Sequence, residues 1–287
     1  MAEVDELTFR AMGSAVQIVV VDGSPGLADA GRRRIEDLDR RWSRVLPDSE
    51  ISQLNEHAGE PIEVSDDTIA LIARAVDAWR FTGGAFDTTV VGAVMFTDIE
   101  IAGNVVVIPQ GSGLDPGGLG RGLAADLVAA ELQRAGAAGV CVNVGGDVRV
   151  IGAGPDGTGW TVALEHPWLA HALVHVGVAD GAVATCTTLA RRGSVDGSAP
   201  QHLIDPRTGK PADTDLNLVT VIAGNAWAAE VLAKALLIRG SAHPFELVDG
   251  AGAEVLVVRE DGAVTVSQGF GWFCRTKTLP AFVRPES

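Results

Sequence analysis

The stretch of the chain best suited to chemistry runs from residue 201 to 209, Gln-His-Leu-Ile-Asp-Pro-Arg-Thr-Gly. It places a histidine, His202, three residues before a carboxylate, Asp205. An imidazole has an ordinary pKa near neutrality, so His202 could take a proton from a nucleophile and later return one. Pro206 and Gly209 predict a turn that holds the histidine beside a rigid loop. The alternative is a partly buried histidine whose ring bonds a backbone carbonyl, and this stretch alone does not separate the two.

The composition is that of a globular chain, whose 287 residues can bury a large core. Hydrophobic residues make up 47% and charged residues 21%, which excludes a disordered chain. The formal net charge of −15 argues against nucleic-acid binding, because such binding depends on Lys and Arg that neutralise phosphates. Three widely spaced cysteines predict neither a disulfide framework nor a zinc site.

The chain carries no pattern that directs it into or across a membrane. Its first residues, Met-Ala-Glu-Val-Asp-Glu, lack a positively charged start followed by an apolar run, so no secretory signal is expected. No segment comes near the roughly 18 uninterrupted apolar residues that predict a membrane span. We therefore expect a cytoplasmic protein.

Hydrophobic periodicity predicts the helices. The spacing of Ile35, Leu38, Trp42 and Val45 predicts an amphipathic surface helix. Ser65 can cap the free amides at the start of a second helix. A third helix is expected to follow the turn at 115–122, and a fourth, buried on one face, to span 226–239.

Strands are predicted by apolar runs between turn residues. They are expected at 15–21, 105–108, 140–144, 148–151, 160–164, 172–178 and 218–223, with a short buried strand that ends at 203–204 and a closing hairpin of 254–258 with 263–267. Glycine turns favour an antiparallel meander from 140 to 178. Because no repeat, linker or shift in composition divides the chain, we expect one α+β domain over 1–287, with an antiparallel or mixed sheet and packed helices.

A glycine-rich turn, Asp-Pro-Gly-Gly-Leu-Gly-Arg-Gly at 115–122, precedes the third predicted helix. Unpaired amides and the positive end of the helix dipole make such a place suitable for a phosphate or pyrophosphate. Glycine-rich helix starts also serve packing alone, and the order of glycines differs from the dinucleotide-binding fingerprint. The turn therefore indicates an anion site only in combination with other features.

Six short motifs occur together in the order found in one known family. They are Ala-Met-Gly-Ser at 11–14, Pro-Asp-Ser-Glu-Ile-Ser-Gln-Leu-Asn at 47–55, Gly-Ala-Phe-Asp at 84–87, the turn at 115–122 with Asp126, Asn-Val-Gly-Gly-Asp at 143–147, and His-Leu-Ile-Asp-Pro-Arg-Thr-Gly at 202–209. In these motifs, which cover about 8–267, the chain resembles the ApbE-type flavin transferases. That family moves FMN from FAD onto a threonine or serine hydroxyl of an acceptor protein, and the resemblance implies a single α+β domain with FAD in a cleft between sheet and helices.

The resemblance also implies a role for individual residues. His202 would activate the acceptor hydroxyl, and the residues that contact FAD would be Met12 at the flavin nucleotide, Ala85, Phe86 and Asp87 at the adenine and ribose, Asp115, Gly118 and Arg121 near the diphosphate, and Leu203 beside the cofactor. Without the resemblance, Met12 and Phe86 could equally be core residues, and Asp87 and Asp115 could equally stabilise turns.

The chain departs from the family pattern at the metal. In the resembling proteins a helix Asp, a Thr four residues on and a backbone carbonyl of the glycine-rich turn hold Mg²⁺. Here the helix carries Glu230 and Lys234. Glu230 could ligate a metal together with the Gly118 carbonyl, but an ammonium only donates hydrogen bonds. We expect a partly buried Glu230–Lys234 pair in which Lys234 contacts the FAD diphosphate in place of a metal.

Three further departures bear on flavin and phosphate contacts. Arg121 stands where the family has lysine, and keeps the charge. An aliphatic residue, Val45 or Leu46, stands where an aromatic one is expected, and the segment 185–187 is Thr-Cys-Thr instead of Thr-Ser-Gly. The sequence thus predicts an FAD-binding FMN transferase whose partners are FAD and an acceptor protein with a Thr or Ser motif. Two alternatives stay open, a flavin-binding protein without transfer activity and an FAD pyrophosphatase that releases FMN and AMP.

Overall fold

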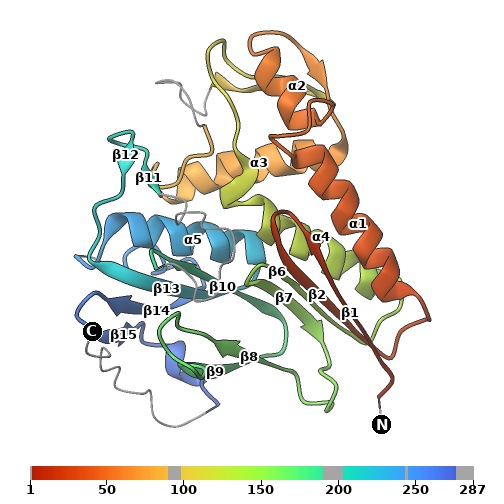
Figure 1. Cartoon of the computed structure of the whole chain (residues 1–287), viewed down its shortest axis with the longest axis vertical. Helices are drawn as coiled ribbons and strands as arrows, with labels where there is room; N and C mark the ends of the chain where they lie inside the picture. The colour runs from red at the N-terminus through yellow and green to blue at the C-terminus, as the bar shows by residue number, and fades with distance from the viewer. Residues whose placement is uncertain (1, 90–97, 190–202, 243–244, 276–287) are drawn as a thin grey trace.

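An eight-stranded antiparallel sheet forms the centre of the computed structural model, which describes residues 2–89, 98–189, 203–242 and 245–275 (Figure 1). From one edge to the other its strands are β1 (Val4–Ala11), β2 (Ser14–Val21), β6 (Gly139–Val144), β7 (Asp147–Gly152), β10 (Gly181–Thr187), β13 (Leu216–Ala223), β14 (Glu254–Arg259) and β15 (Val264–Val266). Every neighbouring pair is antiparallel. The predicted α+β class is therefore confirmed, with an antiparallel sheet.

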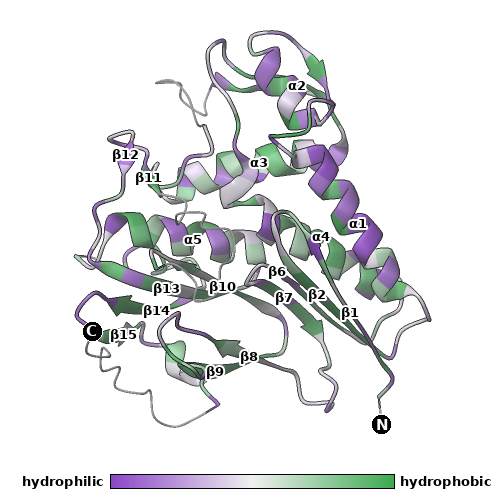
Figure 2. Ribbon diagram, in the orientation of Figure 1, coloured by the Kyte–Doolittle hydropathy of each residue, from purple (hydrophilic) through white to green (hydrophobic). Residues whose placement is uncertain are grey.

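Three helices pack on one face of this sheet, α1 (Leu27–Trp42), α4 (Gly120–Arg134) and α5 (Ala226–Arg239) (Figure 1). Two more, α2 (Glu50–Glu56) and α3 (Asp66–Phe81), lie farther from the sheet, α2 against α1 and α3 against α1 and α5. Figure 2 shows α1 as mostly hydrophilic, which fits the predicted surface helix, whereas α5 is buried nearly all round. The cap at Ser65 is confirmed, because its hydroxyl accepts a bond from the Thr68 amide. The inward placement of Val45 is wrong, since α1 ends at Trp42 and Val45 is 85% exposed.

The opposite face is covered by a separate hairpin of β8 (Trp160–Leu164) and β9 (Val174–Val178) and by the 3-10 helix η3 (Phe270–Trp272). The predicted meander from 140 to 178 is thus wrong in part. Its first hairpin, β6–β7, lies in the large sheet, but β10 pairs with β7 where β8 was expected. The physical reason is that β8 and β9 bury one face against the sheet, through residues such as Leu164 and Val176, and do not extend it.

Two small sheets complete the described chain. One joins β3 (Ile62–Glu63), β5 (Val105–Val107) and β4 (Glu100–Ala102), and the other joins β11 (Ile204–Asp205) and β12 (Lys210–Pro211). The predicted turn at Pro206 is confirmed, since Gly209 has φ +65° and its amide donates to the Asp205 carbonyl. The predicted burial of the preceding strand is wrong for Ile204, which is 49% exposed, whereas Leu203 packs against the core between α5 and the sheet. Among the described helices, none is long and apolar enough to cross a bilayer.

Candidate functional site

The glycine-rich turn forms a single 3-10 turn, η2 (Pro116–Gly118), that leads directly into α4. Asp115 caps it, because Oδ1 accepts a bond of 2.8 Å from the Gly117 amide. The other carboxylate oxygen, Oδ2, lies 3.0 Å from Nη1 of Arg44. Both oxygens of Asp115 therefore have partners, one in the turn itself and one on Arg44.

The segment around Asp87 lies against this turn. The Asp115 amide donates to the Thr88 carbonyl at 2.7 Å, and Thr89 forms an isolated bridge with Leu114. Asp87 stabilises its own loop, since Oδ1 accepts a bond of 2.7 Å from the Thr89 amide. The structure thus brings Asp87 and Asp115 into neighbouring loops, as the predicted site requires.

Gly118 approaches the Phe86 ring closely. A Cβ atom at position 118 would lie 2.7 Å from Cε2 of Phe86 and 3.5 Å from Cδ of Lys234. No side chain fits in that space, so glycine is required here by packing. Phe86 and Ala85 are each 5% exposed and belong to the core, which is the alternative that the sequence left open for Phe86.

Four ionisable side chains meet behind the turn, and we call Arg121, Asp147, Glu230 and Lys234 the charge cluster. Glu230 lies at its centre, 2.7 Å from Lys234 Nζ and 3.2 Å from Arg121 Nη2 through Oε1. Its second oxygen, Oε2, accepts a bond of 2.9 Å from the Gly122 amide. Arg121 Nε lies 2.9 Å from Asp147 Oδ2. The Lys234 ammonium also donates to the Gly118 carbonyl at 3.2 Å.

Burial and neighbouring charges set the ionisation of the charge cluster. The Glu230 side chain is 1% exposed, and burial by itself would raise its pKa, but the Lys234 and Arg121 cations hold the pKa below its ordinary value. Burial and the nearby Glu230 charge raise the pKa of Asp147 to about 6. With both carboxylates ionised, the two cations and the two anions balance. Arg121 keeps 31% of its side chain exposed, more than the other members of the charge cluster.

Asp126 links the two helices, α4 and α5, that carry Arg121, Glu230 and Lys234 of the charge cluster. Its carboxylate oxygens accept bonds of 2.9 Å from the Ala226 and Trp227 amides at the start of α5. Gly122 lets the helices approach, because a Cβ atom there would lie 2.6 Å from the Ala226 carbonyl oxygen. The N-terminal ends of α4 and α5 therefore meet, and the Asp126 carboxylate is the anion that caps the start of α5.

Met12 lies in the turn between β1 and β2. Its backbone has φ +50°, a left-handed conformation that is uncommon for a residue other than glycine, and its amide donates to Asp39 Oδ2 at 2.8 Å. Ser14, which follows this turn, lies close to Gly145, and Arg121 lies close to the same glycine. The turn is therefore near the charge cluster. Strain of this kind is frequent in ligand-binding turns.

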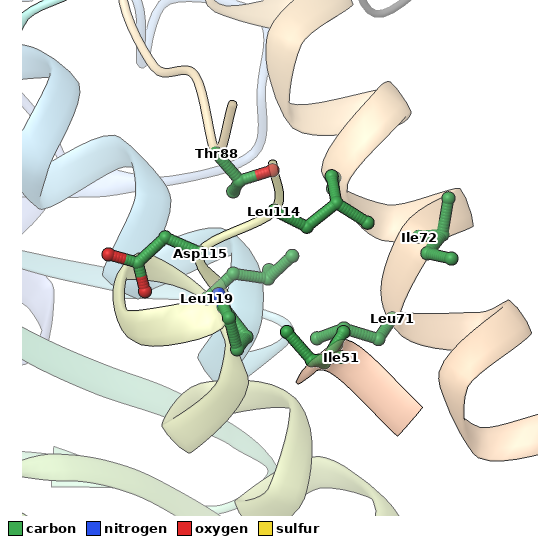
Figure 3. A pocket seen from close by; sticks show the side chains of 9 residues that line it. Ile51, Leu71, Ile72, Thr88, Leu114, Asp115 and Leu119 are labelled. Carbon is green, nitrogen blue, oxygen red and sulfur yellow. The ribbon is translucent and has the colours of Figure 1, made fainter. Parts of the chain in front are cut away.

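A small apolar cavity of about 10 Å³ lies beside the site (Figure 3). Ile51, Leu71, Ile72 and Leu119 line it, and the Asp115 carboxylate points away from them. This volume holds about one water molecule at most, so the cavity is a packing defect and not the cleft for a dinucleotide. Thr88 also lines it, with a buried hydroxyl that has no partner among the described residues.

Replacing Thr88 with valine should raise the free energy of unfolding by about 1 kcal/mol, since burying an unpaired hydroxyl costs more than burying a methyl group. Denaturant unfolding of the purified protein measures the change. Thr68→Val is the matched control, because the Thr68 hydroxyl is also buried but accepts a bond of 3.2 Å from Trp42 Nε1, and its loss should destabilise. Destabilisation by Thr88→Val would show that a water molecule holds the hydroxyl.

The structure brings together most of the residues predicted to form the site. Contacts connect Phe86, Gly118, Arg121, Glu230 and Lys234, while Asp87 and Asp115 occupy the adjoining loops. No such contact links Met12 or Leu203 to them within the described ranges, and Leu203 packs against the core between α5 and the sheet. His202, the predicted catalytic residue, lies outside the described residues.

Asp147 belongs to the motif at 143–147, but the sequence alone assigns it no role. Its signal was a carboxylate directly after a Gly-Gly turn, and the structure shows it 3% exposed and paired with Arg121. Cys186 lies near the same charges. Burial raises the pKa of its thiol, and the Lys234 and Arg121 cations oppose that rise. Both residues lie on strands, β7 and β10, that pack against α4 and α5.

A glycine-rich turn that leads into α4, with the partly exposed Arg121 and Lys234 beside it, is the kind of arrangement that suits a phosphate-bearing ligand. The model of the ApbE family matches residues 12–102 and 93–257, and the chain therefore belongs to the ApbE family. An FAD:protein FMN transferase from Vibrio cholerae is 28% identical, over 97% of this chain and 93% of its own length.

Solved structures agree with this assignment. The flavin transferase ApbE from Vibrio cholerae superposes with a TM-score of 0.81 at 27% identity, over 95% of this chain and all of the other. The ApbE protein from Thermotoga maritima gives a TM-score of 0.84 at 26% identity, over 96% of this chain and all of the other. The predicted family and fold are confirmed.

Proposed function

We propose that this protein is an FAD:protein FMN transferase, which joins FMN from FAD to a threonine or serine hydroxyl of an acceptor protein. The observation that supports this best is the position of two cations beside the turn at 115–122, Arg121 at the start of α4 and Lys234 in the middle of α5. This arrangement suits the diphosphate of a dinucleotide. Family membership and the name of the Vibrio cholerae relative point to the same activity.

The reaction divides between binding and proton transfer. In the proposal, Arg121 and Lys234 hold the diphosphate oxygens and stabilise the negative charge that grows on the leaving AMP. His202 takes the proton of the acceptor hydroxyl as its oxygen bonds to the phosphorus of the FMN half. The bond between that phosphorus and the bridging oxygen breaks, and AMP leaves.

Incubation of the protein with FAD, with and without an acceptor bearing a Thr or Ser motif, tests the proposal. We expect a covalently flavinylated acceptor and AMP, seen by mass spectrometry. Free FMN with AMP and no labelled acceptor would identify a pyrophosphatase. Unchanged FAD in both incubations would support the remaining alternative, a flavin-binding protein without transfer activity.

FAD should bind more tightly than FMN, because only FAD carries the adenylate half and the diphosphate that the turn at 115–122 and the two cations can contact. Titration followed by flavin fluorescence measures both affinities. Asp87→Ala should weaken FAD binding and leave FMN binding unchanged, since Asp87 orders the loop proposed to line the adenine and ribose. Equal affinities for FAD and FMN would contradict this assignment of the loop.

We also propose a cytoplasmic location and an acceptor with a Thr or Ser motif. The three cysteines, Cys141, Cys186 and Cys274, are all free, as is usual in a reducing compartment. Cell fractionation with an antibody to the protein tests the location.

A further inference from the structure

The Lys234 ammonium occupies the position that the family pattern gives to a metal ion. It lies 2.7 Å from Glu230 Oε1 and 3.2 Å from the Gly118 carbonyl oxygen. These are the helix carboxylate and the backbone carbonyl between which the resemblance would place a divalent cation. A positive charge already stands between them, covalently attached to α5.

The residues around this position do not fit a divalent cation. Mg²⁺ takes six oxygen ligands in a nearly regular octahedron. No group of three His, Cys, Asp or Glu side chains suited to a metal is found in the part of the chain that the structure describes. Glu230 Oε2 is already bonded to the Gly122 amide, and a protonated lysine has no lone pair to offer.

Packing holds the lysine in this position. Its side chain is 12% exposed, and its Cδ atom lies beside Gly118, where the Phe86 ring closes the other side. The chain has 22 Lys and Arg residues, of which only Lys210, Lys234 and Lys277 are lysines. An ammonium is compact, whereas a guanidinium is a broad planar fork, so lysine is the cation that fits between two acceptors this close together.

We infer that Lys234 replaces the metal, and that the protein binds FAD without a divalent cation; this inference rests on the proposed function. An ammonium has three N–H donors, of which Glu230 and Gly118 use two. The third has no partner among the residues described, and it donates to an oxygen of the FAD diphosphate. Lys234 thus supplies a contact to the diphosphate and one positive charge at the place where a metal would supply two.

The first test uses the unaltered protein and follows FAD binding by flavin fluorescence. The expected affinity is the same in EDTA and in excess Mg²⁺. In parallel, Mn²⁺ titration monitored by electron paramagnetic resonance should detect no bound ion, with or without FAD. Binding of FAD that EDTA abolishes and Mg²⁺ restores would overturn the inference, as would a bound Mn²⁺ that Glu230→Gln removes.

Variants test the role of the side chain itself. Lys234→Met keeps the length of the stem and removes the charge, and it should weaken FAD binding in EDTA by about tenfold or more, the scale of one charge-assisted hydrogen bond. Lys210→Met, on the exposed strand β12, is the matched control and should bind FAD as the unaltered protein does. Equal affinity in Lys234→Met and Lys210→Met would overturn the inference.

A double variant, Glu230→Asp with Lys234→Thr, restores the family pattern and should convert the site. Its FAD binding should become dependent on Mg²⁺, and Mn²⁺ should now bind. Because the Mn²⁺ measurement needs no FAD, it distinguishes a failure of the proposed function from a failure of the inference. An unaltered protein that binds neither FAD nor Mn²⁺ would contradict the proposed function and the diphosphate contact, whereas one that binds FAD only with a metal would contradict the inference alone.

Discussion

Replacement of His202 by alanine is expected to slow FMN transfer by about 10²- to 10⁴-fold, the usual contribution of a general base, while FAD binding stays nearly unchanged. The reason is that the imidazole acts on the acceptor hydroxyl and not on FAD. Single-turnover transfer to an acceptor measures the rate, and flavin fluorescence measures the affinity.

His171→Ala is the matched control for this variant, because His171 is an exposed histidine on the loop before β9. Its transfer rate should equal that of the unaltered protein. If His202→Ala loses binding and turnover by the same factor, the histidine has a structural role, which is the alternative that the sequence left open. A second check is the pH profile of transfer, whose acidic limb should disappear in His202→Ala.

Replacement of Glu230 by methionine is expected to lower the free energy of unfolding by about 3–5 kcal/mol, the cost of leaving buried charges without their partner. Glu230 is 1% exposed at the side chain and forms ion pairs with both Lys234 and Arg121. The loss also deprives the buried Gly122 amide of its acceptor. Chemical denaturation gives the magnitude directly.

The double variant Glu230→Met with Lys234→Met should recover part of this loss, because no ammonium is then left unpaired while Arg121 keeps Asp147. An equally unstable double variant would show that the unpaired lysine charge is not a cause of the instability. As a surface control, Asp77→Ala breaks an exposed pair with Arg74 and should change stability by no more than about 1 kcal/mol.

Local patterns accounted for most of the elements of this fold. The helix at 226–239 has the predicted limits, and Ser65 caps α3, because capping and helical spacing act within a few residues. The hairpin of β6 and β7 followed from Gly145 and Gly146, which both have positive φ. The position of β8 failed because strand partners are chosen by long-range burial, which periodicity does not encode.

Only those residues of the site that belong to recognisable motifs could be predicted from the sequence. Glu230 and Lys234 are four residues apart on one helix, so their pairing could be expected from spacing. The bonds from Glu230 to Arg121 and to the Gly122 amide span 109 and 108 residues. No local rule reaches that distance, and the burial that raises the pKa of Asp147 exists only once the sheet has formed.

The distance along the chain between the two halves of the charge cluster also sets the order of events during synthesis. Arg121 and Asp147 leave the ribosome long before Glu230 and Lys234, and Asp126 cannot bond the α5 amides until that helix exists. The charge cluster therefore cannot assemble before α5 has been synthesised. Under the proposed function, FAD would bind only after that point and would then stabilise the folded state.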